Sequence, residues 1–504
     1  MGEIMFIKSL KVENFKGFSN ENNYLEFNIP NGNDVGSGLN IFIGENNCGK
    51  STVLEAIDFL RNGTKKDVGS LKYKNSSGDQ LNHASVEVEF TGKIETVINS
   101  FSQQNKKLVF KNKIYSCSKE NMYLKLKRTT EDLKVIFLWD EASQIFENVS
   151  GLDGPLKKLF ETNFIWADTN PNDEAAFGAS TICGVLLSEI VKSHKETKEY
   201  EAFSKKFHDV FNSNESELRQ KLFVIEEKIK NIFQTQFGSA SISFEFEELK
   251  IESFFKNSSI MIDDGIKVPM SEKGNGMQRS VALALLQVYA EVIAFDEEQG
   301  ISKPFYLFID EPEICLHPKG QQKLFEALLE ISKHRQVFVT THSPYFLSSP
   351  YLKNIGLYIF KKSDHKNNIE AAKLNYLFPW SPTWGELNFK AYDLPTIDLH
   401  NELYGYLQDK SEKYSENTFE EWLLENKISK NKIWTREING AVKSPYSVTL
   451  MTFIRNHIHH PENLTMKSNN YTSEELLLSI KQMISLIEKL KVSNVVEQVG
   501  FVSA

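Results

Sequence analysis

The stretch LNIFIGENNCGKS, residues 39–51, decides how this chain folds. It begins as an apolar strand, passes through a glycine-rich turn and continues into a segment with the apolar spacing of a helix. Gly44, Gly49, Lys50 and Ser51 occupy the fixed positions of the GxxxxGK[ST] pattern. In such a turn, backbone N–H groups and the helix N-terminus surround phosphate oxygens. We therefore predict a phosphate-binding loop in an α/β fold. A chance glycine turn is the alternative, and the flanking strand and helix argue against it.

The residues of this loop indicate a nucleoside triphosphate with its metal ion. The Lys50 side chain can reach the β- and γ-phosphates, and the Ser51 hydroxyl can ligate Mg²⁺. ATP and Mg²⁺ are therefore the expected cofactors. The loop residues expected to bind the nucleotide are Gly44, Asn46, Asn47, Gly49, Lys50, Ser51 and Thr52.

A second apolar strand ends in two carboxylates, because residues 305–311 read FYLFIDE. Asp310 suits a role at Mg²⁺, and Glu311 suits the polarisation of an attacking water. A strand that ends in Asp-Glu is common by itself. Beside a phosphate-binding loop, it predicts an enzyme that hydrolyses ATP.

Periodicity predicts the elements around these motifs. Alternating apolar and polar residues predict a strand over 6–19, and helical spacing predicts a helix over 274–294. Short apolar runs predict buried strands over 304–309 and 336–340, with a helix over 320–333 between them. This strand–helix–strand rhythm is typical of a doubly wound or ABC-like sheet.

Four motifs resemble, in their residues and in their order, the ABC-type ATPases of the RecF, OLD and SMC group. VENFKGF at 12–18 resembles the first strand of that group, and KGNGMQR at 273–279 resembles its signature motif. DEPEICLHP at 310–318 resembles the Walker B motif and D-loop, and VTTHSP at 339–344 resembles the switch-histidine segment. The resemblance implies an ABC-type ATPase head with a mixed β-sheet over residues 5–360.

The resemblance also implies how hydrolysis is organised. His342 would contact the γ-phosphate and act in catalysis with Glu311 and Lys50, whereas a buried core histidine is the alternative for His342. The position of the Q-loop glutamine is not evident from the sequence.

The signature motif would present a helix N-terminus to the γ-phosphate held by an opposite subunit. Its nucleotide-binding residues would be Asn275, Gly276 and Gln278. The motif reads GNGMQ where the group has LSGGQ, so Asn275 would replace the serine. Because the chain has one phosphate loop and one signature, the resemblance implies a homodimer or a higher even oligomer.

Composition divides the chain into parts. Residues 198–212 and 216–233 have helical spacing and many charges, which predicts a helical insertion. Periodicity weakens over 372–440, which predicts a linker into a separate, mostly helical unit. The last helix of that unit should begin at a capping box formed by Thr472 and Glu475. The expected domains are an ATPase N-terminal lobe (1–150), the helical insertion (151–240), an ATPase C-terminal lobe (241–371) and a helical C-terminal domain (372–504).

The C-terminal unit contains FIRNHIHH at residues 453–460. Arg455 and His460 match the Arg-polar-x-x-x-His pattern of HEPN-type RNases. The arginine would stabilise a strained phosphate and the histidine would move the proton of a ribose 2′-hydroxyl. A structural or partner-docking unit is the alternative, because arginine and histidine five residues apart also occur by chance.

The combination of a compact ATPase head and a helical tail resembles the ATPases of antiphage systems, namely Septu, PARIS and those attached to some retrons. This resemblance implies an ATP-gated sensor that controls a partner nuclease. OLD nucleases carry a Toprim domain with a DxD pair, and no such pair follows residue 345. Two other functions stay open: a self-contained, ATP-regulated HEPN-like RNase and a RecF-type DNA-repair ATPase.

Composition narrows the class of protein further. The net charge of −9 argues against a protein that coats nucleic acid by charge alone. No apolar run reaches the roughly 18 residues of a membrane span, so none is expected. The cysteines form no CxxC pair, which predicts neither a zinc site nor disulfides and indicates a reducing, cytoplasmic compartment. They are Cys48, Cys117, Cys183 and Cys315.

Overall fold

The structure, a computed structural model, divides the chain into two compact units. The first comprises Met1–Phe164, Ile301–Glu313 and Gln321–Ala504, and the second comprises Ile165–Gly300 and Ile314–Gly320. The domain boundaries expected from sequence stay predictions. The structure describes residues 5–20, 23–64, 66–75, 78, 83–99, 104–116, 122–149, 151–165, 197–237, 243–244, 259–278, 280–282, 284–285, 288, 304–314, 316–363, 366–371, 376–438 and 440–500.

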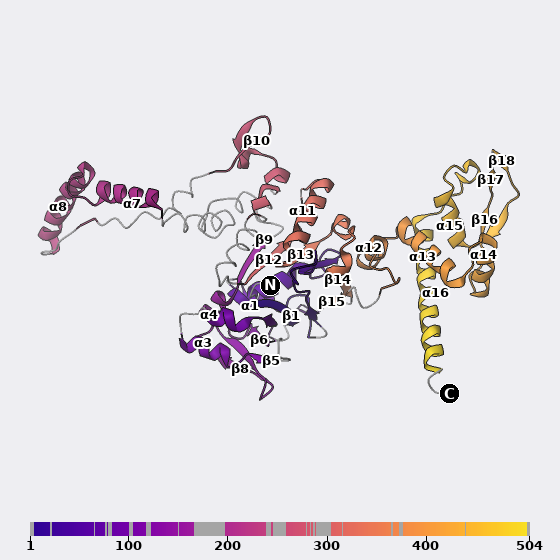
Figure 1. Ribbon diagram of the computed structural model, residues 1–504, viewed down its shortest axis with the longest axis horizontal. Coiled ribbons are helices and arrows are strands. Elements are labelled where there is room, and N and C mark those ends of the chain that lie inside the picture. The colour runs from indigo at the N-terminus through magenta and orange to yellow at the C-terminus, as the bar shows by residue number, and fades with distance from the viewer. Residues whose placement is uncertain are drawn as a thin grey trace. The chain divides into compact units, whose positions relative to one another are not determined.

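A six-stranded sheet in the order β15-β14-β3-β13-β12-β9 forms the core of the first unit (Figure 1). The strands are β3 (Leu39–Gly44), β9 (Glu161–Ile165), β12 (Phe305–Asp310), β13 (Gln336–Thr341), β14 (Gly356–Ser363) and β15 (Lys366–Ala371). β14, β3, β13 and β12 pair in parallel, whereas β15 is antiparallel to β14. Every residue of β3 and β13 is buried. Because parallel strands end at the same edge, β3, β12 and β13 deliver their last residues side by side.

A second, antiparallel sheet has the order β2-β1-β4-β6-β7-β8, with β5 beside β6. Helix α1 (Lys50–Asn62) contacts strands of both sheets. Its predicted apolar stripe, which includes Val53 and Ile57, is buried, and the predicted helix is confirmed. The strands of this sheet are β1 (Met5–Glu13), β2 (Tyr24–Glu26), β4 (Ser85–Gly92), β5 (Tyr115–Ser116), β6 (Met122–Thr129), β7 (Ile136–Asp140) and β8 (Ile145–Val149).

The strand predicted over 6–19 is wrong beyond Glu13. β1 ends there because Asn14 and Lys16 adopt left-handed conformations, with φ of 52° and 49°. The apolar alternation continues through the following turn because Phe15 and Phe18 are both buried. A buried turn therefore reproduced the two-residue period of a strand.

The predicted strands over 304–309 and 336–340 are confirmed as β12 and β13, and the helix between them is α11 (Pro318–Ile331). Short helices complete the ATPase part of the chain. They are η1 (Val68–Leu71), α2 (Ile94–Asn99), α3 (Gln104–Lys111), α4 (Asp153–Leu159), η4 (Pro344–Leu347) and η5 (Leu352–Asn354).

The second unit contains the two helices predicted as an insertion, α7 (Lys198–Phe211) and α8 (Glu217–Phe237). A short hairpin of β10 (Met261–Asp263) and β11 (Lys267–Pro269) leads through η2 (Met270–Glu272) into a helix that begins at Asn275. The predicted helix over 274–294 is thus observed at its start. Its last residues lie outside the described residues, as do Cys117, Cys183 and Cys315.

The C-terminal part is mostly helical, and the predicted linker over 372–440 is wrong. Three helices and short strands occupy most of that range, and their apolar side chains share one buried core with α15 and α16. Leu399, Leu403 and Phe419 are fully buried in this core. The elements are α12 (Trp384–Tyr392), α13 (Ile397–Ser411), α14 (Glu416–Glu425), β16 (Lys432–Trp434), β17 (Glu437–Ile438), β18 (Ala441–Val442), β19 (Tyr446–Val448), α15 (Leu450–His459), η7 (Leu464–Met466) and α16 (Ser473–Gly500).

Weak periodicity did not exclude helices in this range, although it contains Pro379, Trp380, Pro382 and Trp384. Thr383, Thr396 and Ser415 each cap the start of one of these helices with their side-chain oxygen, a local signal that the sequence does contain. The predicted capping box before α16 is confirmed, because the Thr472 and Glu475 side chains each accept the other residue's backbone N–H at 3.2 Å. Among the described residues, no helix has the length and apolar character needed to cross a bilayer.

Candidate functional site

The common edge at the ends of β3, β12 and β13 borders a cavity of about 340 Å³. Most of the site residues predicted from the sequence line it, and Gly44 and Asp310 contact side chains that line it. The cavity is therefore built by the two sequence motifs and the histidine segment together. Its lining residues are Lys16, Gly17, Asn46, Asn47, Gly49, Lys50, Ser51, Thr52, Glu55, Glu311, His342, Lys362 and Asn367.

Two glycines of the loop are required by packing as well as by backbone conformation. Gly44 has a φ of 147°, and a Cβ there would lie 2.2 Å from the carbonyl oxygen of Phe360 in β14. Gly49 has a φ of 98°, and a Cβ there would lie 2.5 Å from Nδ2 of Asn367. Contacts this short exclude a side chain at either position, so both glycines let the loop lie against β14 and β15.

The Lys50 ammonium group is held inside the loop. It donates to the carbonyl oxygens of Gly44 and Glu45, at 3.1 and 2.9 Å, and lies 2.8 Å from Nε2 of His342. Burial lowers the pKa of Lys50, although nearby acidic groups act in the opposite direction. A phosphate that replaced these neutral acceptors would gain a poorly solvated cation, which is the stronger kind of hydrogen-bonding partner.

Ser51 and Asp310 meet at the bottom of the cavity. The Ser51 hydroxyl donates to Oδ1 of Asp310 at 2.7 Å, and the Thr340 hydroxyl donates to the same oxygen at 2.6 Å. Asp310 itself is buried. Mg²⁺ in phosphate sites takes one or two protein oxygens and completes its shell with phosphate and water. The Ser51 and Asp310 oxygens fit the protein's share of such a site.

Glu311 has a strained backbone that turns the chain at the end of β12. Its φ is 47°, which costs a residue with a side chain about 1–2 kcal/mol. Its N–H donates to both the carbonyl and hydroxyl oxygens of Thr340, at 3.1 and 3.0 Å, which holds the turn. Its Oε1 lies 3.2 Å from Nε2 of His342 at the cavity wall.

His342 stands between a cation and a carboxylate. Its Nε2 can accept a hydrogen bond from Lys50 only when unprotonated, and can donate to Glu311 only when it carries a proton. Burial lowers the pKa of His342 and the Lys50 charge lowers it further, whereas Glu311 raises it. The ring is therefore biased toward the neutral form, and one proton on Nε2 decides which neighbour it binds.

Glu313 is a residue of this site that the sequence reading did not include among the site residues. Its Oε1 accepts the backbone N–H groups of His342 and Ser343, at 2.5 and 3.1 Å, and so ties the histidine segment to the end of β12. Burial raises the pKa of Glu313. The DEPE motif contained this signal, because Glu313 follows Glu311 by two residues.

Five further cavity residues, Gly17 among them, were also missed. Lys16 follows β1, and its ammonium group pairs with Glu55 of α1. Lys362 in β14 and Asn367 in β15 face each other across this strand pair. Lys16 and Gly17 lie in a motif quoted from the sequence, VENFKGF. The other three residues depend on how the chain folds around the phosphate loop.

The signature segment lies in the second unit. Gly274 and Asn275 are exposed at the start of their helix. The Gln278 amide is instead buried, and it donates to the carbonyl oxygens of Lys273 and Ser271, at 2.6 and 3.3 Å. Gln278 therefore holds the shape of its own loop, while Asn275 and Gly276 form the helix start that the sequence assigned to a nucleotide.

Arg455 and His460 gather at the C-terminal end of α15. The Arg455 guanidinium lies over the Tyr404 ring at 5.9 Å, and Nη1 donates to the Asn456 side chain at 3.3 Å. His460 caps the helix and its Nδ1 lies 3.2 Å from Glu462. Burial lowers the pKa of His459, and the charges of Arg455 and His460 lower it further.

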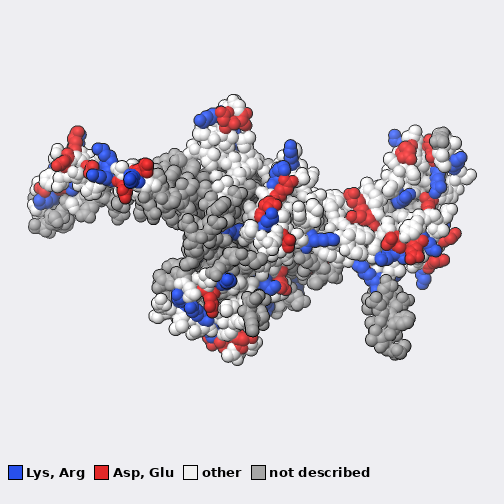
Figure 2. All heavy atoms as spheres, in the orientation of Figure 1, with Lys and Arg blue, Asp and Glu red and all other residues white. Residues whose placement is uncertain are grey.

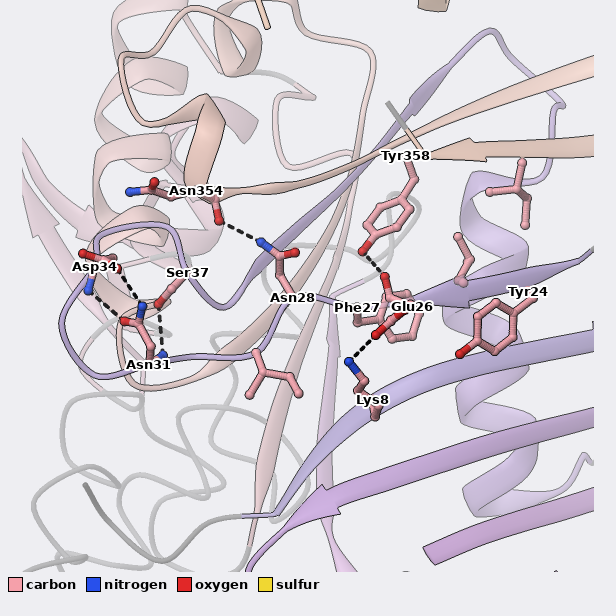
Figure 3. A pocket seen from close by; sticks show the side chains of 13 residues that line it. Lys8, Tyr24, Glu26, Phe27, Asn28, Asn31, Asp34, Ser37, Asn354 and Tyr358 are labelled. Atoms are coloured by element: carbon pink, nitrogen blue, oxygen red, sulfur yellow. Dashed lines mark hydrogen bonds and ion pairs between the residues drawn. The ribbon is translucent and has the colours of Figure 1, made fainter. Parts of the chain in front are cut away.

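A second cavity, of about 760 Å³, lies beside β2 and the start of β14. Figure 3 shows that its polar groups point toward one another: Lys8 pairs with Glu26, Tyr358 donates to the Glu26 carbonyl at 2.5 Å, and Asn28 donates to the Asn354 carbonyl at 2.7 Å. No predicted site residue lines it. The smaller cavity is therefore the candidate functional site.

Comparison with known proteins indicates the same class of protein as the site does, an ATPase. The model of the AAA_15 family, described as an AAA ATPase domain, matches residues 5–347, and the chain belongs to this family. It is an ATPase related to nucleases. The Old nuclease of Escherichia phage P2 is 27% identical over 327 residues, which cover 62% of this chain and 54% of that protein. Endonuclease GajA of Bacillus cereus is 23% identical over 414 residues, which cover 68% and 59%.

The chain covers less than two thirds of the length of each of these relatives. Solved structures with similar folds include an SMC head bound to a ScpA domain, with 13% identity and a TM-score of 0.42 over 73% of this chain and 99% of that one. The recombination mediator RecF with ATP has 16% identity and a TM-score of 0.36, over 74% and 99%. The resemblance to the OLD group is thus confirmed by sequence relatives.

Proposed function

We propose that the cavity at the sheet edge is where this ATPase binds and hydrolyses ATP. One observation carries the proposal: three strand ends bring an ammonium, a hydroxyl–carboxylate pair, a second carboxylate and an imidazole to one small cavity. The Ser51 hydroxyl lies 2.7 Å from Asp310, and the Lys50 ammonium lies 2.8 Å from the His342 ring.

The loop divides the binding of the triphosphate among its residues. Lys50 leaves its neutral carbonyl partners for the β- and γ-phosphate oxygens. Ser51 and Asp310 hold Mg²⁺, which when bound neutralises charge on the phosphates. Backbone N–H groups of the loop and of the first turn of α1 take the remaining oxygens. The loop residues concerned are Gly44, Asn46, Asn47, Gly49 and Thr52.

Glu311 and His342 act on the bond that breaks. The Glu311 carboxylate, turned into the cavity by its left-handed backbone, orients and polarises the attacking water. The His342 ring, released by Lys50 when the lysine binds phosphate, is free to contact the γ-phosphate. Its position therefore reports whether that phosphate is present.

The metal assignment is tested with Ser51→Ala. Loss of one of two protein oxygens should raise the Mg²⁺ concentration for half-maximal ATP turnover about tenfold or more. Ser70→Ala removes an exposed hydroxyl on η1 and is the matched control. An unchanged Mg²⁺ requirement in Ser51→Ala would remove this residue from the metal site.

We also propose that two chains close over two nucleotides. The exposed helix start at Gly274–Gly276 supports this arrangement, because a helix N-terminus attracts an anion. An even oligomer follows from one loop and one signature per chain. Asn275 would supply the polar contact that the serine of other signatures makes.

The structure offers a sharp test of the dimer. A Cβ at Gly274 meets nothing within 4 Å, so the chain itself can accept Gly274→Trp. That indole should block an opposing subunit and abolish association induced by Mg-ATP, measured by sedimentation. Gly405→Trp, at an equally open position in α13, should associate as the wild type does. Full association of Gly274→Trp would contradict the arrangement.

The wider role we propose is ATP-dependent control of a nuclease partner in antiphage defence. The relation to a phage nuclease and to an endonuclease supports the link to nucleic acid cleavage. Co-expression with a candidate nuclease should give DNA or RNA cleavage that Lys50→Ala changes; cleavage unaffected by ATP and by that variant would contradict the control.

A self-contained RNase is the second candidate, favoured by the position of Arg455, His459 and His460 at the C-terminal end of α15. It predicts that His460→Ala abolishes RNA cleavage by the purified chain while ATP turnover is retained. Equal cleavage by the variant would exclude the pair.

A RecF-type DNA clamp has weaker support. On the face in Figure 2, acidic and basic side chains are interspersed over the described parts, and the net charge is −9. Such a clamp predicts DNA binding that weakens steeply with salt. DNA binding of that kind, together with a chain that activates no nuclease, would favour this alternative.

A further inference from the structure

The segment that carries His342 is held on both sides by α12, the first helix of the C-terminal part. The Tyr392 hydroxyl donates to the carbonyl oxygen of Thr341, one residue before the histidine, at 3.3 Å. The Trp384 indole N–H donates to the carbonyl oxygen of Pro344, two residues after it, at 3.1 Å. α12 also contacts β3, β14 and η4. Both ends of α12 are therefore hydrogen-bonded to the segment that contains His342.

The Tyr392 phenol is half-buried beside the histidine segment. Burial raises the pKa of Tyr392; the side chains of Glu313 and Cys48 act in the same direction, and the Gly44 backbone opposes them. Cys48 and Gly44 belong to the loop, and Glu313 holds the His342 N–H. The phenol is thus hydrogen-bonded to the same histidine segment that Glu313 holds.

α12 is joined closely to the rest of the C-terminal helices. A Cβ at Gly385 would lie 2.8 Å from the backbone nitrogen of Leu399, so α12 and the start of α13 are in direct backbone contact. The Thr383 hydroxyl donates to Glu402 of α13 at 2.6 Å. A displacement of α13 would therefore move α12, and with it the carbonyl groups that flank His342.

We propose that Trp384 and Tyr392 are positioning residues for ATP hydrolysis, which set the His342 ring against Lys50 and Glu311. The C-terminal part is then a component of the ATPase site, and a protein bound to its helices can alter turnover through α12. This inference rests on the proposed function, because it needs His342 to act on the γ-phosphate.

Conservative variants test the proposal in the full chain. Tyr392→Phe and Trp384→Phe each remove one hydrogen bond and keep a ring, so each should lower kcat about three- to tenfold. The affinity for ATP should stay within about twofold, because Lys50 and the loop are untouched. Tyr404→Phe is the matched control: it removes the 3.0 Å hydrogen bond to Thr452 in the C-terminal core and should leave kcat unchanged.

A double-variant cycle separates positioning from general destabilisation. In a His342→Ala background, Tyr392→Phe should cause no further loss of kcat, because both changes act through the same ring. Wild-type kcat in both single variants, or losses that multiply in the cycle, would overturn the positioning role while the proposed function stands. Wild-type turnover by His342→Ala itself would overturn the proposed function, and this inference with it.

Discussion

The C-terminal helical core and the edge of the parallel sheet both bury charged side chains, but they satisfy them differently. In the helical core, hydrogen bonds and ion pairs satisfy the buried carboxylates. Glu420 accepts the backbone N–H and the hydroxyl of Thr449, at 3.0 and 2.6 Å. Glu386 accepts the Leu377 N–H at 2.7 Å and pairs with Lys390 at 2.8 Å. These carboxylates have stable, non-competing partners.

At the sheet edge, the partners compete. The Lys50 ammonium and the Glu311 carboxylate both lie within 3.2 Å of one imidazole nitrogen of His342. Glu311 and Asn47 also hold left-handed backbones, with φ of 47° and 61°. Strain and competition of this kind are maintained at functional sites, where a ligand resolves them.

The contrast teaches that burial of charge alone does not mark a site in this chain. Buried carboxylates whose hydrogen bonds are satisfied belong to the structural core. Buried charges that compete for one partner mark the candidate site. Four variants test this contrast, and the expected changes in ATP turnover or stability differ widely among them.

The largest effect is expected from Lys50→Ala. Removal of the cation that contacts both His342 and the loop carbonyls should reduce ATP turnover about a hundredfold or more. Lys361→Ala, on the exposed end of β14, is the matched control and should retain full turnover. Steady-state phosphate release measures both. If the turnover of Lys50→Ala stays within threefold of the wild type, the competition of Lys50 and Glu311 for His342 has no role in ATP hydrolysis.

A second large effect is expected on the stability of the helical core at acid pH. Burial lowers the pKa of His400 from about 6.5 to about 3, with His459 adding to the shift. Because the folded pKa lies below the unfolded value, the stabilisation is complete above pH 6.5. It should fall by about 1.4 kcal/mol per pH unit as the pH drops from 6.5 toward 3.

Hydrogen exchange of α13 amides, corrected for intrinsic rates, should show this slope in the wild type. His400→Gln has no titrating ring and should show a flatter dependence. Equal slopes in both proteins would show that another group controls the acid response.

A smaller effect is expected from Glu420→Ala. The variant leaves the Thr449 N–H and hydroxyl without their acceptor, which should cost about 2 kcal/mol in the unfolding free energy. ATP turnover at temperatures where the variant is folded should stay unchanged. Glu421→Ala, at an exposed position on α14, is the matched control and should change neither quantity. Urea unfolding gives the comparison; equal stability of the two variants would contradict the role of the closed network.

The smallest effect is expected from His460→Ala on the ATPase. Its ring is exposed at the helix end and pairs only with Glu462 among the interactions described. ATP turnover should remain within about twofold of wild type because no transition-state contact is lost. A larger loss of turnover would show that the end of α15 affects the nucleotide site.

Much of the ATPase part could be predicted because its signals are local. The run from Leu39 to Ser51 contains both the strand and the helix start, and the strand before Asp310 is fully apolar. The loop glycines illustrate the limit. Sequence assigned them to phosphate approach, whereas Gly44 and Gly49 are also required by contacts with β14 and Asn367, which only the folded sheet reveals.

The C-terminal helices and the remaining site residues could not be predicted because they depend on tertiary contacts. The predicted linker became three helices because α13 and α14 form a core with α15 and α16, while α12 packs against α13, β14 and η4. Lys362 and Asn367 reach the cavity from a hairpin far along the chain. Tyr392 hydrogen-bonds the segment of His342 from a helix that the sequence did not predict. Residues that reach a site from distant elements carry no spacing signal.

The most direct test of the account is single-turnover hydrolysis by Glu311→Gln in the full chain. We expect the variant to bind Mg-ATP with an affinity within threefold of the wild type and to cleave it at least about a hundredfold more slowly. Glu326→Gln, on the exposed face of α11, should cleave at the wild-type rate. Cleavage by Glu311→Gln at a rate near that of wild type would contradict the assignment of the sheet edge as the hydrolytic centre.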